Sequence, residues 1–256
     1  MRPIYKVGKM AQKIKMNRII YMLPFLINKI NKVATIATMA ILICFYMQAC
    51  KRNVGNPVDL KQEYFPVTIG NWIIYDVVDI RHDINHDTLN YQIKEMITAD
   101  FFDNSGRLAQ RVERYVRDSD TEPWQFGDVW HSIRTSRSAE KVEEDERFVK
   151  LIFPVTEFKY WDGNAYNQRV SWEYYFDSID YSGVVGSIVY DSLAYVMQRE
   201  NSNFVEYEQA FEVYAKNIGL VEKQLIDLDV RSGMIVLDSI VKGIELYQTA
   251  IDYGSN

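Results

Sequence analysis

The residues best suited to chemistry are few, because the chain contains only 3 histidines and 2 cysteines. His82 and His86 flank an expected turn, each followed by an aspartate, and imidazole with carboxylate is a ligand set that suits zinc. No third cluster completes a coordination sphere, so a solvated hairpin turn is the preferred interpretation. His131 lies in a strand-like run beside Trp130, with no recognisable nucleophile partner. We therefore predict no metal site, no cofactor and no catalytic residue.

Other polar patterns also fall short of a catalytic motif. The acidic run at residues 143–146 lacks the alternating aspartates of a calcium loop and predicts an exposed turn. Residues 183–187 (GVVGS) match neither a nucleophile elbow nor a phosphate loop and predict a flexible connection. Glycoside hydrolysis needs two carboxylates at a defined separation, and 35 acidic side chains give no basis for choosing a pair. The sequence thus favours a protein that is not an enzyme.

Aromatic residues are abundant and allow two interpretations. Trp172, Tyr174, Tyr175 and Phe176 could stack against sugar rings, but aromatic side chains are also enriched in strands, where they pack in a half-buried surface. Core packing is the preferred interpretation. Four Asp-Ser/Thr-aliphatic tripeptides begin at residues 87, 177, 191 and 238. They resemble an O-glycosylation sequence of exported proteins in some Gram-negative bacteria, and ordinary turn chemistry explains them equally well.

The charge distribution separates the N-terminal segment from the rest of the chain. Residues 1–49 hold 8 of the 29 basic side chains and no acidic one, which leaves 21 basic and 35 acidic side chains, a net charge of −14, in residues 50–256. Positive charge before an apolar run, here residues 33–49, is typical of an export signal. The acidic remainder has no basic face for phosphates, so nucleic acid is excluded as a partner.

The end of the apolar run, Met47-Gln48-Ala49-Cys50, resembles the lipobox of bacterial lipoprotein precursors. The resemblance implies cleavage before Cys50, acylation of its thiol and anchoring by two or three acyl chains. We expect a signal peptide at residues 1–49, a lipidated tether at 50–63 and one β domain at 64–256. The alternatives are an uncleaved transmembrane anchor and a buried helix with an incidental cysteine. Translation could start at Met1, Met16 or Met22, and the expected location is the outer membrane, facing the periplasm or the cell surface.

From residue 64 onward the sequence is typical of β-structure. Runs rich in Tyr, Trp, Val and Ile alternate with Gly, Asn, Asp and Ser, and no long stretch has helical periodicity. Strands are expected at residues 72–80, 89–98, 108–117, 129–138, 147–153, 170–179, 188–198, 205–215, 219–228 and 243–253. Short helices at 177–185 or 230–241 are alternatives. The predicted fold class is all-β, a curved antiparallel sheet forming a half-barrel or sandwich in a single domain.

Three short segments carry a second resemblance. Residues 64–66 (YFP) with 70–72 (GNW), 160–164 (YWDGN) and 214–221 (YAKNIGLV) are similar to segments of uncharacterised Gram-negative envelope lipoproteins. The last segment is also similar to a late hairpin of half-barrel lipoprotein carriers. The resemblance implies a curved sheet that cradles a hydrophobic ligand, with Asn217 and Gly219 accommodating the turn.

These observations lead to one preferred function and two alternatives. The preferred hypothesis is a non-enzymatic, membrane-anchored envelope lipoprotein that binds a hydrophobic ligand or a protein partner. The first alternative is a carbohydrate-binding or carbohydrate-active surface lipoprotein. The second is a structural accessory subunit of an envelope complex.

Overall fold

The computed structural model describes residues 28–29, 31–32, 34–43, 57–83, 86–231 and 239–256. Within the first three of these ranges the chain is helical. No helix among the described residues has the length and apolar character needed to cross a bilayer. Cys44 and Cys50 lie outside the described residues, so the predicted acylation site has no structural test. Residues Val58–Asn256 form one compact unit.

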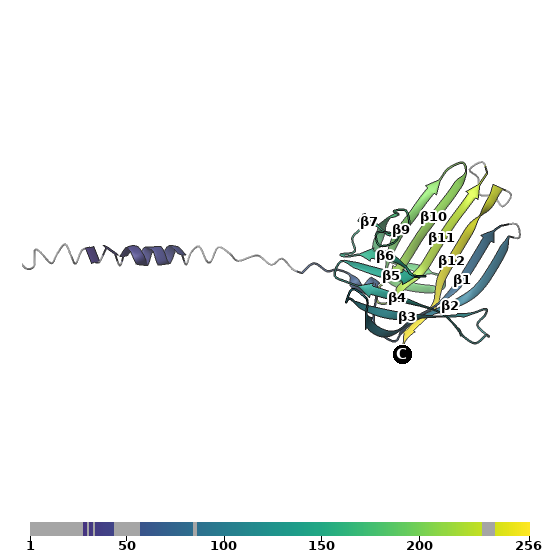
Figure 1. The fold of residues 1–256 in the computed structure, drawn as a ribbon, viewed down its shortest axis with the longest axis horizontal. Helices are drawn as coiled ribbons and strands as arrows, with labels where there is room; N and C mark the ends of the chain where they lie inside the picture. The colour runs from purple at the N-terminus through teal and green to yellow at the C-terminus, as the bar shows by residue number, and fades with distance from the viewer. Residues whose placement is uncertain (1–27, 30, 33, 44–56, 84–85, 232–238) are drawn as a thin grey trace, which may run out of the picture. The chain divides into compact units, whose positions relative to one another are not determined.

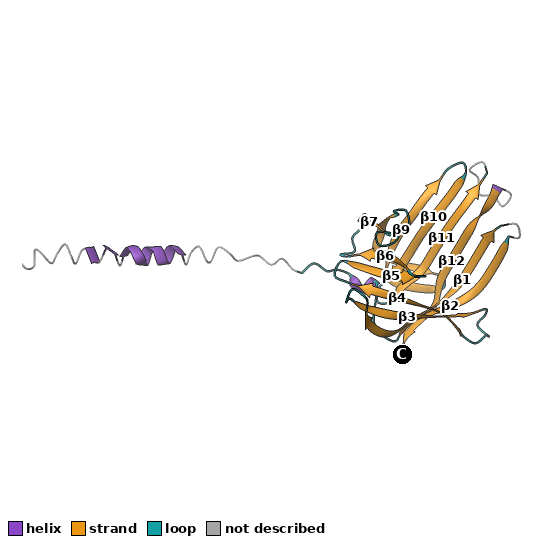
Figure 2. Cartoon of the chain, in the orientation of Figure 1, coloured by secondary structure: helices purple, strands orange, loops and turns teal. Residues whose placement is uncertain are grey.

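This unit is built almost entirely from one antiparallel sheet, as Figures 1 and 2 show. Its twelve strands follow the order β6-β5-β4-β3-β2-β1-β12-β11-β10-β9-β8-β7, so every neighbour except β1–β12 is also a neighbour in sequence. The strands are β1 (Asn71–His82), β2 (Asp87–Phe102), β3 (Leu108–Arg117), β4 (Gln125–Arg134), β5 (Ser138–Glu143), β6 (Glu146–Ile152), β7 (Tyr160–Asp162), β8 (Glu173–Val185), β9 (Ile188–Ser202), β10 (Glu206–Ala215), β11 (Gly219–Val230) and β12 (Ile240–Ser255).

The two edge strands of this sheet approach each other, so the sheet is nearly closed into a barrel. The amide of Val149 in β6 donates to the carbonyl of Gly163, directly after β7, at 2.9 Å. The Trp161 indole N–H donates to the Val149 carbonyl at 2.9 Å, and the Asn167 amide donates to the Arg147 carbonyl at 3.0 Å. These bonds satisfy edge groups that would otherwise offer a template for pairing with another chain.

The segment that precedes β1 closes one end of the barrel. Its short 3-10 helix η1 (Gln62–Tyr64) places Tyr64, which is 0% exposed, against β8 and β9. The Tyr64 hydroxyl donates to Asp180 at 2.8 Å and lies 2.8 Å from the Ser192 hydroxyl. On the opposite wall, the Arg134 guanidinium donates to the Phe65 carbonyl at 2.8 Å. We call residues 58–66 the plug, because they bridge opposite sides of the barrel at the end where the chain enters it.

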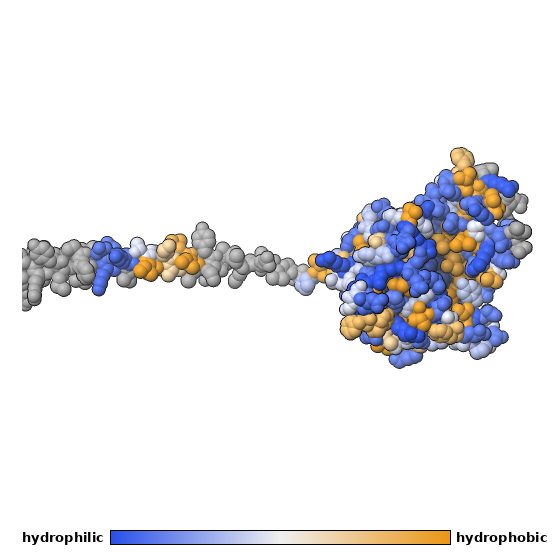
Figure 3. All heavy atoms as spheres, viewed as in Figure 1, coloured by the Kyte–Doolittle hydropathy of each residue, from blue (hydrophilic) through white to orange (hydrophobic). Residues whose placement is uncertain are grey.

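At the other end, the long strands project beyond their shorter neighbours. The β9 strand pairs with β8 only as far as Met197, and β2 pairs with β3 only from Gln92. Figure 3 shows a mostly hydrophilic surface with a strip of hydrophobic residues over the concave side of these projecting strands. We call this end the mouth. The plug and the mouth are therefore opposite ends of one barrel.

The all-β class and the curved antiparallel sheet predicted from the sequence are confirmed. Nine of the ten expected strands correspond to observed ones. The end of the run at 129–138 is wrong, because β4 ends at Arg134 and a turn at residues 135–137 precedes β5, most of which was not expected. Strand β7 was missed. A helix at 177–185 is also wrong, because β8 covers those residues. The helix proposed at 230–241 falls mostly on residues outside the described ranges.

Of two expected loops, one differs from the prediction and one agrees with it. The flexible connection at 183–187 is a tight hairpin: Val185 pairs with Ile188, and Gly186 at its tip has a φ of 58°. The late hairpin is as predicted, with φ of 64° at Asn217 and 107° at Gly219. A single residue with positive φ costs least when it is glycine or asparagine, which is why these two residues mark turns.

Candidate functional site

Charged side chains cross the interior of the barrel. The Lys150 ammonium on β6 lies 2.8 Å from Glu212 on β10 and 3.0 Å from Glu143 on β5. Strands β6 and β10 are far apart in the sheet order, so this contact is possible only because the sheet curls until they face each other. A second pair joins Lys141 on β5 to Glu95 on β2 at 2.7 Å. Together these groups form an ionic belt inside the barrel.

The belt extends to two further cations and is almost sealed from solvent. Arg114 on β3 lies 3.2 Å from Glu95, and Lys223 on β11 lies 3.8 Å from Glu143. Glu212 is 0% exposed and the Lys150 side chain 6%. Charges this deeply buried persist only when they are paired, because an isolated buried ion is very costly.

Mutual attraction favours the ionised forms of Glu143, Glu212 and Lys150. Burial alone would raise the pKa of Glu143, but the ammonium groups of Lys150, Lys223 and Lys141 outweigh it and lower that pKa well below its usual range. The pKa of Glu212 is lowered in the same way, chiefly by Lys150 against the effect of burial. Burial would lower the pKa of Lys150, but Glu143 and Glu212 raise it above its ordinary value.

These shifts predict a loss of stability in acid. A carboxylate whose pKa is lowered on folding stabilises the protein above its unfolded pKa, about 4.3 for glutamate, and this stabilisation disappears as the pH falls through the folded value. Glu95, Glu143 and Glu212 all have lowered pKa values. We expect the free energy of unfolding in urea to be steady from about pH 7 to 5 and to fall steeply below about pH 4. Equal stability at pH 7 and pH 3 would contradict the ionised belt.

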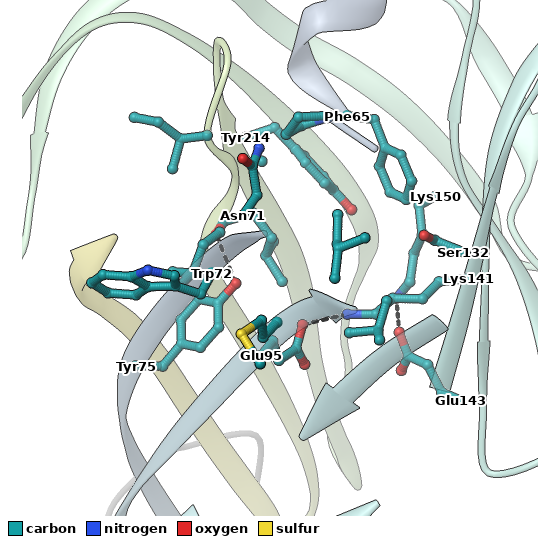
Figure 4. Close-up of a pocket in the computed structure, with 18 residues that line it drawn as sticks. Phe65, Asn71, Trp72, Tyr75, Glu95, Ser132, Lys141, Glu143, Lys150 and Tyr214 are labelled. Atoms are coloured by element: carbon teal, nitrogen blue, oxygen red, sulfur yellow. Dashed lines mark hydrogen bonds and ion pairs between the residues drawn. The ribbon is translucent and has the colours of Figure 1, made fainter. Parts of the chain in front are cut away.

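Between the belt and the plug lies a small apolar cavity, shown in Figure 4. Its volume is about 90 Å³. Phe65 and Pro66 of the plug and Ile73, Val112 and Leu220 of the barrel line it. The belt forms its polar side, where Glu95 meets Lys141 and Glu143 meets Lys150 in the figure. A drug-sized ligand generally needs about 300–1,000 Å³, so this space is too small for a lipid.

On the other side of the belt a second cavity, of about 220 Å³, lies toward the mouth. We call it the mouth cavity. Four aromatic residues line it: Trp130, Phe148, Trp172 and Tyr174. Seven charged residues line it as well: Glu143, Glu144, Glu146, Lys150, Arg169, Glu212 and Lys223. Gln198 and Leu225 complete the wall, which therefore combines flat apolar rings with dense hydrogen-bonding groups.

The rings of the mouth cavity are held in place by the protein's own cations. The Arg114 guanidinium lies 3.6 Å from the centre of the Trp130 ring, and that of Arg199 lies 4.8 Å from the Trp172 ring. Cation–π contacts of this kind stabilise a partly desolvated ring by about 0.5–2 kcal/mol. The aromatic walls are consequently positioned before any ligand arrives.

The histidines of the sequence prediction do not gather at this site. His82 is 5% exposed, and its Nε2 lies 2.7 Å from a Glu245 carboxylate oxygen. The expected solvated turn is therefore wrong for His82. Strand β1 extends as far as His82, and the side chain is buried. His86 lies edge-on to it at 5.6 Å, while His131 on β4 contacts Phe101. The described residues contain no cluster of three or more groups able to hold a metal ion.

The acidic run and the aromatic cluster have mixed outcomes. Glu144 and Asp145 form the expected turn, with φ of 48° and 63°, but Glu143 is directed into the barrel and belongs to the belt. Tyr174 and Phe176 are buried in the core, as predicted. Trp172 and Tyr174 also line the mouth cavity, which places two members of the cluster where the sugar-stacking alternative requires aromatic rings.

The residues that the sequence did not reveal are Lys150, Glu212, Lys223 and Gln198. Glu212 lies between Phe211 and Val213, and Lys150 between Val149 and Leu151, so both neighbours of each charge are apolar. The alternation of apolar and polar residues along these strands is therefore lost, and the sequence cannot show which side chains face the barrel interior. A charged residue within an apolar run was the one signal in the sequence that could have indicated a buried charge. It could not identify the partner, because Lys150 and Glu212 are 62 residues apart.

Fold and site together define a class: a plugged, nearly closed antiparallel barrel with a polar and aromatic cavity at its mouth. No family model matches the chain, and no curated protein matches it. Among solved structures, a candidate lipoprotein from Parabacteroides distasonis ATCC 8503, determined at 2.70 Å, is similar over 75% of this chain and 98% of its own. The TM-score is 0.33 and the sequence identity 10%.

Proposed function

We propose that the chain is a lipid-anchored protein of the bacterial envelope whose barrel binds a small polar ligand at its mouth, without catalysis. The basic segment, the apolar run and Cys50 support the anchor, which we assign to the outer membrane on its periplasmic side. The mouth cavity supports the binding role.

One observation carries the binding proposal: the mouth cavity contains a buried hydrogen-bond donor without a partner. Gln198 on β9 is 6% exposed and lines the cavity, and its side-chain nitrogen is enclosed by protein atoms without an acceptor. Leaving such a group unsatisfied costs about 1–3 kcal/mol, so natural proteins rarely retain one without a role. A rotation of the Gln198 side chain would present this nitrogen to the cavity, where an acceptor atom of a ligand would satisfy it.

The ionisation of the cavity supports binding over hydrolysis. A glycosidase needs one carboxyl group that holds a proton and a second that is ionised. Glu143 and Glu212, the two most enclosed carboxylates of the wall, both have lowered pKa values and are both bound to Lys150. Neither would carry the proton that a general acid donates.

The filled interior favours a small polar ligand over a lipid. The ionic belt separates the two cavities, and their volumes of about 90 and 220 Å³ both lie below the usual range for drug-sized ligands. A diacyl lipid would have to displace the Lys150–Glu212 pair and leave buried charges without partners.

The anchor also gives the binding site an orientation. Seven residues lie between Cys50 and Val58, and the eight steps along the chain span at most about 28 Å. The chain enters the barrel at the plugged end, opposite the mouth. A lipid on Cys50 would hold the plugged end toward the bilayer and leave the mouth facing away from it, where soluble ligands have access.

Indole N–H signals in NMR spectra provide the test, because the tryptophans report on different places. Trp72 lines the apolar cavity, Trp130 and Trp172 line the mouth cavity, and Trp124 lines neither. We expect sugars or other small polar compounds, added to the full-length protein in detergent, to shift the signals of Trp130 and Trp172 and to leave Trp124 unchanged. Shifts confined to Trp72 on adding alkyl compounds would contradict the proposal and favour a hydrophobic ligand.

A further inference from the structure

The chemistry of the mouth cavity defines the class of ligand more narrowly, beginning with its charge. The lining side chains carry three positive and four negative charges, so the net charge of the wall is −1. They also neutralise one another: Lys150 pairs with Glu143 and Glu212, and Arg169 pairs with Glu146. A phosphate or carboxylate would find no unpaired excess of cations, and an ammonium compound would compete with lysines already in place.

The hydrogen-bonding groups of the wall include both donors and acceptors. Gln198 offers an amide N–H that lacks an acceptor, and Tyr174 lines the same space. Carboxylates of Glu144 and Glu146 lie on the wall as acceptors. Hydroxyl groups are the ligand groups that donate and accept at the same atom, so a ligand with several hydroxyls matches a mixed wall.

The aromatic residues supply a surface for the apolar face of a ring. Arg199, the residue after Gln198 on β9, holds Trp172 through a cation–π contact, and Trp172 and Gln198 line the same cavity. A sugar ring presents C–H groups on one face and hydroxyls around its edge, so one face can pack on an indole while the edge forms hydrogen bonds. The volume of about 220 Å³ suits one ring rather than a long oligosaccharide or a lipid.

We propose that the mouth cavity binds a neutral saccharide ring, which packs on Trp172 and accepts a hydrogen bond from the Gln198 amide. This inference rests on the proposed binding function and adds the class of ligand. Gln198 is then a specificity-determining residue, because it satisfies its donor only when an acceptor is present.

Calorimetric titration of the full-length protein, in a detergent without a sugar headgroup, tests the ligand class. The probes are glucose, galactose and N-acetylglucosamine, with glucuronate and glucosamine as charged counterparts. We expect at least one neutral sugar to bind, and the charged counterparts to bind at least tenfold more weakly. Preferential binding of a charged counterpart would overturn the saccharide proposal.

The variant Gln198→Met tests the role assigned to the amide. We expect it to weaken binding of the neutral sugar about tenfold, the effect of one lost hydrogen bond. It should remain folded, because it removes a donor that has no partner in the protein. Gln110→Met is the matched control: Gln110 is 3% exposed and also has an unsatisfied atom, but it lies on β3 and does not line the cavity. It should bind sugar like the parent protein.

The outcomes separate this inference from the function on which it rests. Equal sugar affinity in folded Gln198→Met and in the parent protein would overturn the assigned contact. If no neutral sugar binds, but another polar compound shifts the Trp130 and Trp172 signals, the saccharide class is wrong and the binding site stands. If no polar compound shifts either signal, the proposed function itself fails.

Discussion

Replacing Lys150 by methionine is expected to lower the free energy of unfolding by about 3–5 kcal/mol, because it leaves two buried carboxylates without their shared cation. Glu212 is 0% exposed and the Glu143 side chain 14%, so water can replace the lost ammonium only in part. Methionine has a similar length but no charge, which limits the loss of packing. For a domain of this size the change corresponds to a fall in Tm of roughly 10 °C. Urea denaturation at pH 7 measures it.

Two variants serve as controls for this prediction. Lys242→Met removes a lysine whose side chain is 71% exposed and pairs with Asp229 on the surface, and it should change stability by less than about 0.5 kcal/mol. Adding Glu212→Gln to Lys150→Met should recover part of the loss, because the most deeply buried charge is then neutral. A Lys150→Met protein as stable as its parent would show that the belt does not hold these charges together.

Replacing Cys50 by serine is expected to abolish acylation completely, since no other thiol remains after residue 50. The proposed thioether bond would form on the sulfur of this residue, and the resemblance to lipoprotein precursors implies that cleavage depends on it. We expect the variant to retain residues 1–49 and to incorporate no labelled fatty acid. Intact mass and fatty-acid labelling are the suitable measurements. Membrane fractionation is not, because the uncleaved apolar run would itself bind a bilayer.

The second cysteine provides the matched control. Cys44 lies inside the apolar run, so Cys44→Ser should leave both processing and labelling intact. A Cys50→Ser protein of mature mass that still carries a fatty acid would contradict the assignment of the anchor. So would a parent protein that keeps its first 49 residues in cells, which would make the apolar run a permanent membrane anchor.

Much of the fold could be predicted because turn residues and alternating runs are local signals. Leu108–Arg117 was predicted to the residue, and the late hairpin was recognised from Asn217 and Gly219. The elements that the sequence did not predict lack such local signals. Strand β7 has three residues, too few for an alternating pattern, and the turn at 135–137 between β4 and β5 contains no Gly, Pro, Asn or Asp.

Closure of the sheet and the site inside it could not be predicted in the same way. Val149 meets Gly163 only because strands at opposite edges of the sheet come together, and no sequence pattern encodes that approach. The belt depends on the same approach, since Lys150 and Glu212 are 62 residues apart. Trp172 was singled out for its residue type, but its position beside Gln198 required the register of β8, β9 and the connection before them.

Native mass spectrometry of the acylated protein, released from membranes in mild detergent and then mixed with a neutral sugar, tests most directly whether the barrel is a site for small polar ligands. We predict a mass that corresponds to the polypeptide from Cys50 with its covalent acyl chains and no bound lipid. On addition of the sugar we predict a 1:1 adduct that is lost in Gln198→Met and kept in Gln110→Met. A stoichiometric, noncovalently bound diacyl lipid that excludes the sugar would contradict the proposal and establish the barrel as a carrier of hydrophobic ligands.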